Sequence, residues 1–342
     1  MERSFIYKLT IATLVHLSVY GIATSSLPVD VLIEKANIYY EQPLENGLPH
    51  EFPLADLSEL KSLKDFKVII HGFTASRFHN SIKPLKQAYL AQGKDNVLLA
   101  DWSEAAKVDY PTARKIVRKV SLTLAKILED FINKFNIEKS EIHVIGHSLG
   151  AHIAGCIGHY FVGSLGRVTG LDPALPLFTP KSPDGLNSDS ALFVDVIHTD
   201  YPVFGDLVPR GSVDFYPNYG FTGQKGCDEF DLVTASKLIF KSYSCSHNRA
   251  VLLYAESIGL PRNFPSIPCS LHGIKSRNVG ICQQKIVEQG LTVTSLREAI
   301  ANMRNETVVY MGEAASNSTT GIYFLETYGA PPYGLGLYTQ IL

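Results

Sequence analysis

The chain has 342 residues and lacks the features that would place it outside the ordinary globular class. It contains no internal repeat, no low-complexity tract and no linker rich in Pro, Gly and Ser. Its formal net charge is only −2 at pH 7, which provides no basic surface for nucleic acid. The charged fraction of 19% and the hydrophobic fraction of 45% are typical of a globular domain. We therefore expect one folded domain and no nucleic-acid partner.

Long hydrophobic runs are also absent, since no segment has the roughly 20 consecutive apolar residues that a membrane-spanning helix needs. The most apolar stretch is short, lies between residues 9 and 23, follows the charged Arg3 and Lys8, and leads into small residues. This order is typical of a cleaved signal peptide, with a membrane anchor as the alternative. We predict a signal peptide over residues 1–25. Residues 26–342 then form a single secreted, extracellular domain with no transmembrane segment.

Cysteine is scarce, with five residues, and four of them fall in one stretch: Cys227, Cys245, Cys269 and Cys282. Four cysteines allow three pairings, among which the sequence by itself does not choose. Sequential pairing would close two short loops. Cys156 stands apart among residues that suit a tightly packed helix, and we interpret it as a buried free thiol. Two glycosylation sequons agree with secretion: Asn305-Glu306-Thr307 and Asn317-Ser318-Thr319.

Apolar runs of strand length alternate with helical patterns, which predicts βαβ units and a mostly parallel sheet in an α/β fold. Continuous apolar runs such as Val68-Ile69-Ile70 fit strands that are buried on both faces. Helices are expected from about residue 111, from Leu149 and near His247, because apolar residues recur there at helical spacing. The predicted strands cover 67–71, 96–101, 141–145, 167–171 and 193–198, with late strands at 308–310 and 321–325.

The strongest motif is Gly146-His147-Ser148-Leu149-Gly150, which has the form G-x-S-x-G. It follows a predicted strand and precedes a predicted helix, the context in which this motif forms a nucleophile elbow in α/β hydrolases. The glycines leave room at the tight turn, and the serine lies at a helix N-terminus, where the dipole favours negative charge. We predict Ser148 as a catalytic nucleophile. The alternative is a strand-to-helix turn that serves only packing.

In hydrolases of this fold the acid follows the serine along the chain, at the carboxyl end of a strand. Asp172 occupies such a position, directly after a predicted strand and before Pro173. Asp200 follows the next predicted strand and is a weaker candidate. Asp195 lies inside that strand, where a structural pairing is expected. We predict Asp172 as the acid.

The base should be a histidine that comes after the acid in the chain, and His198 and His247 compete for this role. His198 lies inside an apolar strand, which favours a core position. His247 follows Cys245, and we expect it in a loop that enters a helix and is held by a disulfide. The oxyanion hole should use two backbone N–H groups, that of Leu149 after the serine and that of Phe73 after an earlier strand.

Together these residues resemble the pancreatic lipase family, and most closely its secreted insect branch of neutral lipases and venom-type phospholipases A1. The resemblance implies an α/β-hydrolase fold with a mostly parallel central sheet flanked by helices, and an ester of a glycerolipid as substrate. It extends to the yolk proteins of flies, which lack the serine that this chain keeps. The matching motifs run in family order from about residue 40 to 330: 71–74, Asp101-Trp102, 146–150, 170–174, 198–200, 214–218 and 245–247.

In this family the segment between the two cysteines before the histidine is a lid over the active site. The corresponding segment here is rich in apolar side chains, which are costly in water unless they fold against something. An ordinary packed helix is the alternative. With the resemblance, the sequential pairing Cys227–Cys245 and Cys269–Cys282 is the expected one. The predicted lid residues are Cys227, Phe230, Leu232, Val233, Leu238, Ile239, Phe240, Tyr243 and Cys245.

The lid and the loop over 201–210 look shorter than in pancreatic triglyceride lipases. In the family this shortening accompanies phospholipase A1 or galactolipase activity, although the lid is not as reduced as in venom phospholipases. We therefore expect a phospholipase A1 that cleaves the sn-1 ester at a lipid–water interface. A triacylglycerol or neutral lipase is the alternative within the enzyme class. A non-catalytic lipid-binding protein like the yolk proteins is the alternative outside it.

Two departures from the family pattern shape the remaining expectations. The chain ends near the close of the catalytic domain, so we expect neither the C-terminal β-sandwich of pancreatic lipase nor dependence on colipase. The segment that resembles the family's calcium loop, 179–190, keeps Asp184, Asn187 and Asp189 with an altered charge pattern. Such a set is typical of a solvated turn, and we predict no metal and no cofactor.

Overall fold

The structure is a computed structural model that describes residues 27–42, 50–60, 65–180, 182–227, 237–287 and 308–336. The predicted signal peptide lies outside these residues. The strands are β1 (Asn37–Gln42), β2 (His50–Pro53), β3 (Phe66–Ile70), β4 (Asn96–Asp101), β5 (Ile142–His147), β6 (Arg167–Leu171), β7 (Phe193–Ile197), β8 (Val213–Pro217), β9 (Pro265–Pro268), β10 (Val309–Tyr310) and β11 (Gly321–Leu325). The helices are α2 (Val29–Glu34), α3 (Lys83–Gln92), α4 (Ser103–Ala106), α5 (Tyr110–Phe135), α6 (Leu149–Tyr160), α7 (Lys237–Gly259), α8 (Leu271–Ser276) and α9 (Val279–Val287).

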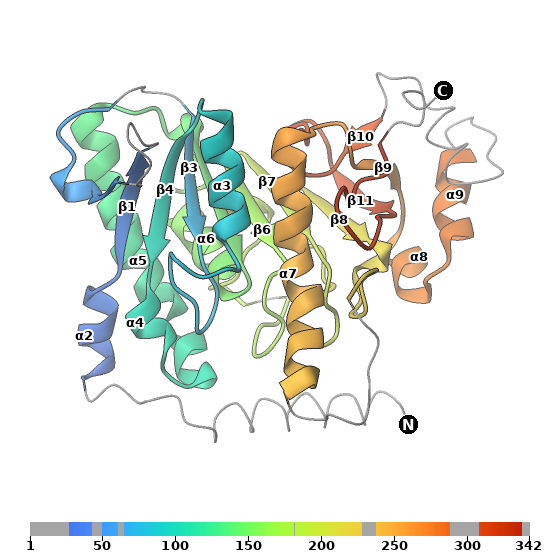
Figure 1. Cartoon of the computed structure of the whole chain (residues 1–342), viewed down its shortest axis with the longest axis horizontal. Coiled ribbons are helices and arrows are strands. Elements are labelled where there is room, and N and C mark those ends of the chain that lie inside the picture. The colour runs from blue at the N-terminus through green and yellow to red at the C-terminus, as the bar shows by residue number, and fades with distance from the viewer. Residues whose placement is uncertain are drawn as a thin grey trace.

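The described strands form one sheet in the order β10-β9-β11-β8-β7-β6-β5-β3-β4-β1-β2, which Figure 1 shows face on. The strands from β4 through β3, β5, β6, β7 and β8 to β11 pair in parallel. Antiparallel pairing is confined to the two margins, where β1 and β2 lie at one side and β9 and β10 at the other. The prediction of a mostly parallel α/β sheet is confirmed.

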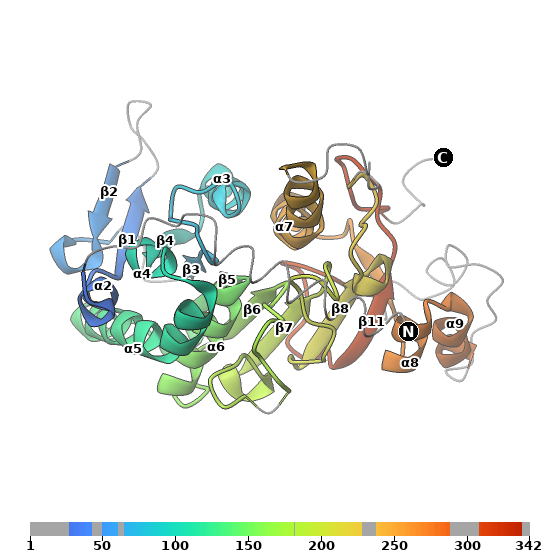
Figure 2. The same ribbon diagram turned by 90° about the horizontal axis from the view of Figure 1, so that it is seen from below.

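Helices cover both faces of this sheet, as the end-on view in Figure 2 shows. Helices α3 and α7 lie on one face, and α5 and α6 lie on the other. Side chains of β3 alternate between the two cores, since Val68 and Ile70 pack in the cluster that contains α5 and α6 while Ile69 packs with α3 and α7. Because both faces are covered, the central strands read as continuous apolar runs rather than as an alternating pattern.

The predicted central elements lie within two residues of the observed ones, and the predicted helix from residue 111 is α5. Asp109 begins this helix by accepting a hydrogen bond from the backbone N–H of Thr112 at 3.0 Å. Sequence reasoning missed β1, β2, β8 and β9, and the helices α2, α3, α4, α8 and α9. The missed strands are marginal or carry polar residues and proline, so their apolar signal is weak.

Both expected disulfides are present, Cys227–Cys245 and Cys269–Cys282, and Cys156 is a free, buried cysteine. Burial raises the pKa of the Cys156 thiol to about 11, so this thiol is not a reactive one at neutral pH. Among the helices of the described residues, none is both long enough and apolar enough to cross a membrane.

Candidate active site

The turn between β5 and α6 places Ser148 at the carboxyl edge of the sheet. Its backbone has φ 59° and ψ −123°, a left-handed conformation that costs a non-glycine residue about 1–3 kcal/mol. Glycine is required on both sides of it. A Cβ on Gly146 would lie 2.1 Å from the carbonyl oxygen of Gly150, and one on Gly150 would lie 2.6 Å from the carbonyl oxygen of His71. The local sequence therefore forms the sharp strand–turn–helix bend that the motif predicts.

Asp172 lies at the end of the neighbouring strand β6 and is completely buried. One carboxylate oxygen accepts the backbone N–H groups of Thr199 at 2.7 Å and Asp200 at 3.1 Å. The other oxygen is 2.6 Å from Nδ1 of His247. Since the strands are paired, the backbone N–H of Ser148 also donates to the carbonyl of Leu171 at 3.0 Å. Ser148 and Asp172 are thus fixed side by side by the sheet.

His247 lies inside α7, so our expectation of a loop entering a helix is wrong. The helix runs without Pro or Gly from Lys237 to Ser257, and nothing in the local sequence stops it before His247. Ser246 also does not cap a helix, because its hydroxyl accepts the N–H groups of Gly223 and Gln224 at 3.0 and 3.1 Å. The disulfide does hold this region, since Cys245 is two residues away.

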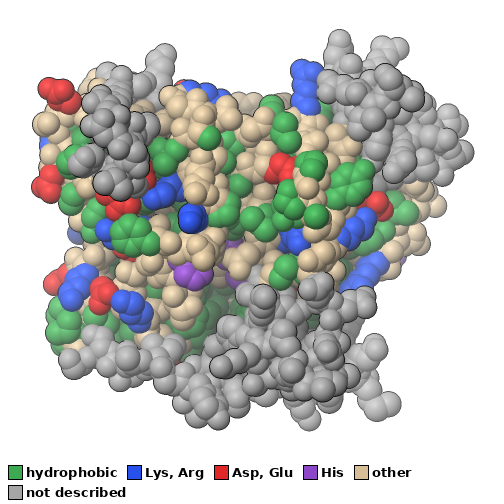
Figure 3. All heavy atoms as spheres, viewed as in Figure 1, with side chains coloured by type: hydrophobic (Ala, Val, Ile, Leu, Met, Phe, Trp, Pro, Cys, Tyr) green, Lys and Arg blue, Asp and Glu red, His purple; other side chains and the backbone are tan. Residues whose placement is uncertain are grey.

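His147 connects the nucleophile turn to the helix that carries His247. Its Nε2 is 3.0 Å from the carbonyl oxygen of His247, and the two imidazole rings are 4.6 Å apart. His147 immediately precedes Ser148, so this contact brings His247 to the edge where Ser148 and Asp172 lie. In Figure 3 histidine surface appears within a recess of the described face.

Three histidines are buried and have pKa values well below the ordinary one, mainly because burial disfavours the charged ring. We call them the buried neutral histidines. His152 shows the arrangement clearly. Its Nε2 donates to the carbonyl of Ala174, and its Nδ1 accepts the N–H of Leu186, a pattern that only a neutral ring can satisfy. The buried neutral histidines are His143, His147 and His152.

The rival residues have other partners. Asp195 forms a two-point ion pair with Arg167 at 2.8 Å, as expected for a structural residue. His198 is buried and its Nε2 is 2.8 Å from Asp214. Burial opposes the charge of this ring, yet the Asp214 carboxylate raises the pKa of His198 above its usual value. The other side-chain partners are Thr169 for Asp195 and the carbonyl of Asp206 for His198.

Asp200 is different, because it lies beside Asp172. Its backbone N–H donates to Asp172, and its own carboxyl is completely buried. Burial and the nearby Asp172 carboxylate raise the pKa of Asp200 well above its ordinary value. Atoms of Asp172, Asp200 and His247 lie within 4.8 Å of one another, a spacing that could hold a metal ion. The 2.6 Å contact between Asp172 and His247 is, however, a direct hydrogen bond, which explains the arrangement without an ion.

The segment after β3 packs directly against the nucleophile. A Cβ on Gly72 would lie 2.9 Å from Cβ of Ser148, so no side chain fits between them. Phe73 follows, and its ring meets the ring of Tyr110 edge to face at 5.1 Å. Leu149 is the first residue of α6 and is completely buried. Leu149 therefore directly follows Ser148, and Phe73 directly follows the glycine that packs against the serine.

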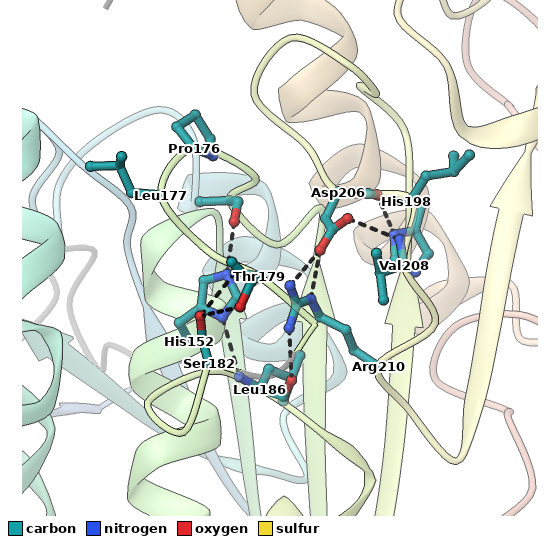
Figure 4. Close-up of polar contacts among 12 residues, drawn as sticks. His152, Pro176, Leu177, Thr179, Ser182, Leu186, His198, Asp206, Val208 and Arg210 are labelled. Carbon is teal, nitrogen blue, oxygen red and sulfur yellow. Dashed lines mark hydrogen bonds and ion pairs between the residues drawn. The ribbon is translucent and has the colours of Figure 1, made fainter.

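The loops that follow Asp172 are tied together by polar contacts, which Figure 4 shows. Arg210 donates to the carboxylate of Asp206 at 2.8 Å and to the carbonyl of Leu186 at 3.4 Å. His198 approaches the carbonyl of Asp206 at 2.6 Å. The loop over 201–210 is thus anchored to the loop over 174–186.

The residues of the calcium-loop resemblance also have partners in the protein. The carboxylate of Asp184 accepts hydrogen bonds from two guanidinium nitrogens of Arg114, at 2.6 and 3.0 Å. Asn187 accepts the N–H of Asp189 at 2.9 Å and caps a short 3-10 turn. Asp189 is exposed to solvent. The prediction that no metal binds here stays a prediction.

Much of the predicted lid lies outside the described residues, including Phe230, Leu232 and Val233. For Leu238, Ile239, Phe240 and Tyr243 only the backbone is described, as the first part of α7. Of the two sequons, Asn305 lies outside the described residues, and Asn317 is exposed.

Known proteins are similar in sequence to part of this chain. Phospholipase A1 member A of Rattus norvegicus is 39% identical over 215 residues, which cover 62% of this chain and 46% of that protein. Lipase member H of Rattus norvegicus is 38% identical over 219 residues, with the same coverage. The chain spans about half the length of the curated relatives it matches.

Among solved structures, an α/β hydrolase from a deep-sea metagenome library aligns with 49% of this chain and 71% of its own, at 21% identity and a TM-score of 0.28. The family comparison is much more extensive, because the sequence model of the lipase family matches residues 49–310. That range includes the nucleophile turn, Asp172 and the helix of His247. The chain therefore belongs to the pancreatic lipase family.

Proposed function

We propose that this chain hydrolyses carboxylic esters of glycerolipids through an acyl-enzyme on Ser148. The observation that carries the proposal is the 2.6 Å hydrogen bond between the buried Asp172 carboxylate and Nδ1 of His247. This pair adjoins a serine held in the strained turn of a nucleophile elbow. Family membership adds independent support.

We assign each group the role that this geometry supports. The Asp172 carboxylate only accepts hydrogen bonds, so Nδ1 of His247 carries a proton and Nε2 is the basic nitrogen. Nε2 takes the Ser148 proton as the hydroxyl oxygen bonds to the ester carbonyl carbon. The resulting imidazolium then protonates the leaving alcohol. Water, activated by the same ring, breaks the acyl–serine bond and regenerates the serine.

The developing oxyanion would be held by the backbone N–H groups of Phe73 and Leu149. Phe73 follows Gly72, which packs against Ser148. The N–H of Leu149 lies in the first turn of α6, where helix N–H groups have no partner within the helix. A donor of this kind is worth about 10²–10³ in rate. The preceding residue Gly72 lies so close to the serine that a Cβ on it would be 2.9 Å from the serine Cβ.

The substrate that we propose is a phospholipid cleaved at the sn-1 ester. The relatives named phospholipase A1 support this choice, and those named lipase keep a triacylglycerol or neutral lipase as the second candidate. We also propose that the protein is secreted, that Asn317 is glycosylated and that the segment 227–245 acts as a lid at a lipid–water interface without colipase. The exposed position of Asn317 supports its modification.

The test of the reaction is the Ser148→Ala variant of the full chain. Wild-type protein should react with a fluorophosphonate probe and hydrolyse a p-nitrophenyl ester, whereas the variant should fold normally and lose both by several orders of magnitude. A variant that keeps its turnover would disprove this nucleophile. Lipid binding by the wild type without labelling or turnover would instead support a non-catalytic carrier.

The test of the substrate uses phosphatidylcholine with different acyl chains at the two positions, in parallel with a triglyceride emulsion. Release of the sn-1 chain from the phospholipid is the expected result. Preferential release from the emulsion would favour the neutral lipase. A glycerophospholipid with an ether bond at sn-1 is the matched control, because it should release nothing.

A further inference from the structure

The segment 71–77 carries Phe73, and a single carboxylate from the neighbouring strand holds both of its ends. Asp101 ends β4, which pairs in parallel with β3. Its Oδ1 is 3.1 Å from Nε2 of His71, the first residue of the segment. Its Oδ2 accepts a hydrogen bond of 2.6 Å from Arg77, the last residue. We call this arrangement the Asp101 clamp.

The residues that follow Asp101 make further contacts with the beginning and the middle of the segment. The indole N–H of Trp102 donates to the carbonyl of His71 at 2.8 Å, and the two rings stack with centroids 5.4 Å apart. The backbone N–H of Thr74 donates to the carbonyl of Ala106 at 3.2 Å. The strand end and α4 therefore form a continuous support beneath the backbone on both sides of Phe73.

Asp101 and His71 are buried, whereas Arg77 is partly exposed. Burial disfavours the charge of Asp101, but the contacts with His71 and Arg77 lower the pKa of this carboxyl far below its usual value. Arg77 is itself held by Glu51 at 2.9 Å. Its guanidinium also lies 3.9 Å from the centre of the Tyr39 ring. Charge-assisted bonds of this kind are stronger and geometrically stricter than neutral ones.

The clamp bears on the reaction because the segment touches the nucleophile. Gly72 is so close to Ser148 that a Cβ there would lie 2.9 Å from the serine Cβ. The position of the segment thus sets the distance between the N–H of Phe73 and the oxyanion that forms when Ser148 attacks the ester. A displacement of about 1 Å in a catalytic arrangement can cost on the order of 10²-fold in rate.

We propose that Asp101 is a positioning residue for ester hydrolysis, which holds the Phe73 N–H in register with Ser148 by clamping His71 and Arg77. The inference rests on the function proposed above. Asp101 acts through the segment and not on the substrate. Loss of Asp101 should therefore weaken stabilisation of the transition state while leaving the affinity for the ester unchanged.

The test compares Asp101→Asn with wild type in the full chain, with active sites counted by a fluorophosphonate. The amide has the same shape but loses the charge and one acceptor. We expect kcat for a short-chain p-nitrophenyl ester to fall by about 10- to 100-fold, where the larger value is the loss of rate when one oxyanion donor is removed. KM should change by less than about twofold. Affinity for a trifluoromethyl ketone, whose adduct carries the oxyanion, should fall in proportion to kcat/KM.

Asp195→Asn is the matched control, because Asp195 is also a buried strand carboxylate paired with an arginine but contacts neither the segment nor Ser148. It should lower the unfolding temperature without changing kcat or ketone affinity. If Asp101→Asn fails to fold, Arg77→Met removes one arm of the clamp and should give a smaller loss of the same kind.

A folded Asp101→Asn variant with wild-type kcat, or with equal losses of ketone affinity and ester affinity, would overturn the positioning role. The same conclusion would follow from an Arg77→Met variant with unchanged kcat if the first variant does not fold. Absence of labelling and turnover in the wild type would instead overturn the proposed function. The two failures are therefore distinguishable.

Discussion

Replacement of Asp172 by asparagine is the sharpest test of the active-site geometry. Oδ1 of Asp172 accepts two backbone N–H groups, from Thr199 and Asp200, at 2.7 and 3.1 Å. In Asp172→Asn the amide oxygen must stay on these donors, because an amide nitrogen cannot accept them. The amide NH2 then faces Nδ1 of His247, which has to become an acceptor. The ring proton moves to Nε2, the nitrogen that should accept the proton of Ser148.

The expected loss follows from this change of tautomer. The same substitution in the serine-protease triad lowers kcat by about 10⁴, which corresponds to about 5.5 kcal/mol of activation free energy. We expect a loss of about this size in kcat/KM for a soluble p-nitrophenyl ester. Thermal unfolding should show a folded variant, since the two backbone hydrogen bonds persist.

Asp200→Asn is the matched comparison. Burial and the nearby Asp172 carboxylate raise the pKa of Asp200 well above its ordinary value, which favours the protonated carboxyl that an amide resembles in shape. The backbone N–H that Asp200 donates to Asp172 is also unaffected. We expect less than about a tenfold loss, the scale of 1.4 kcal/mol. Large inactivation by Asp200→Asn, with Asp172→Asn still active, would show that the acid has been misidentified.

Three further predictions concern stability. Gly150→Ala should lower the free energy of unfolding by more than about 3 kcal/mol in urea titrations, because its Cβ would meet the His71 carbonyl at 2.6 Å. Gly259→Ala, whose Cβ would lie 3.9 Å from Nε2 of Gln92, should change it by less than about 0.5 kcal/mol, and equal effects would contradict the steric argument. The buried neutral histidines have folded pKa values below their unfolded values, so their contribution is present above about pH 6.5 and is lost as pH falls. Unfolding measured from pH 7 to 5 should show a decline of up to about 1.4 kcal/mol per pH unit for each ring, and greater stability at pH 5 would refute this. Removing Cys227–Cys245 by serine substitution should cost about 3 kcal/mol and also lower kcat, because Cys245 adjoins His247, whereas removing Cys269–Cys282 should cost stability alone.

The sequence by itself determined the features that depend on neighbouring residues. The elbow around Ser148 was predictable because two glycines, the pattern of a strand and the pattern of a helix all lie within a few residues of the serine. The central parallel strands were predictable because burial on both faces makes them continuously apolar. The helix α5 was predictable because apolar residues recur at helical spacing from about residue 111. Each of these signals is local, so no knowledge of the rest of the fold is needed.

Tertiary structure decided the features that depend on distant segments. Asp172 and Asp200 both follow strands in the sequence, and only the fold shows that the first contacts His247 while the second donates its backbone N–H. The helical position of His247 was missed because the cysteine before it suggested a loop. The Asp101 clamp joins residues more than 20 positions apart, through a carboxylate whose two oxygens point to two different partners. Sequence reports which side chains are available, whereas the pairing of strands decides which of them meet.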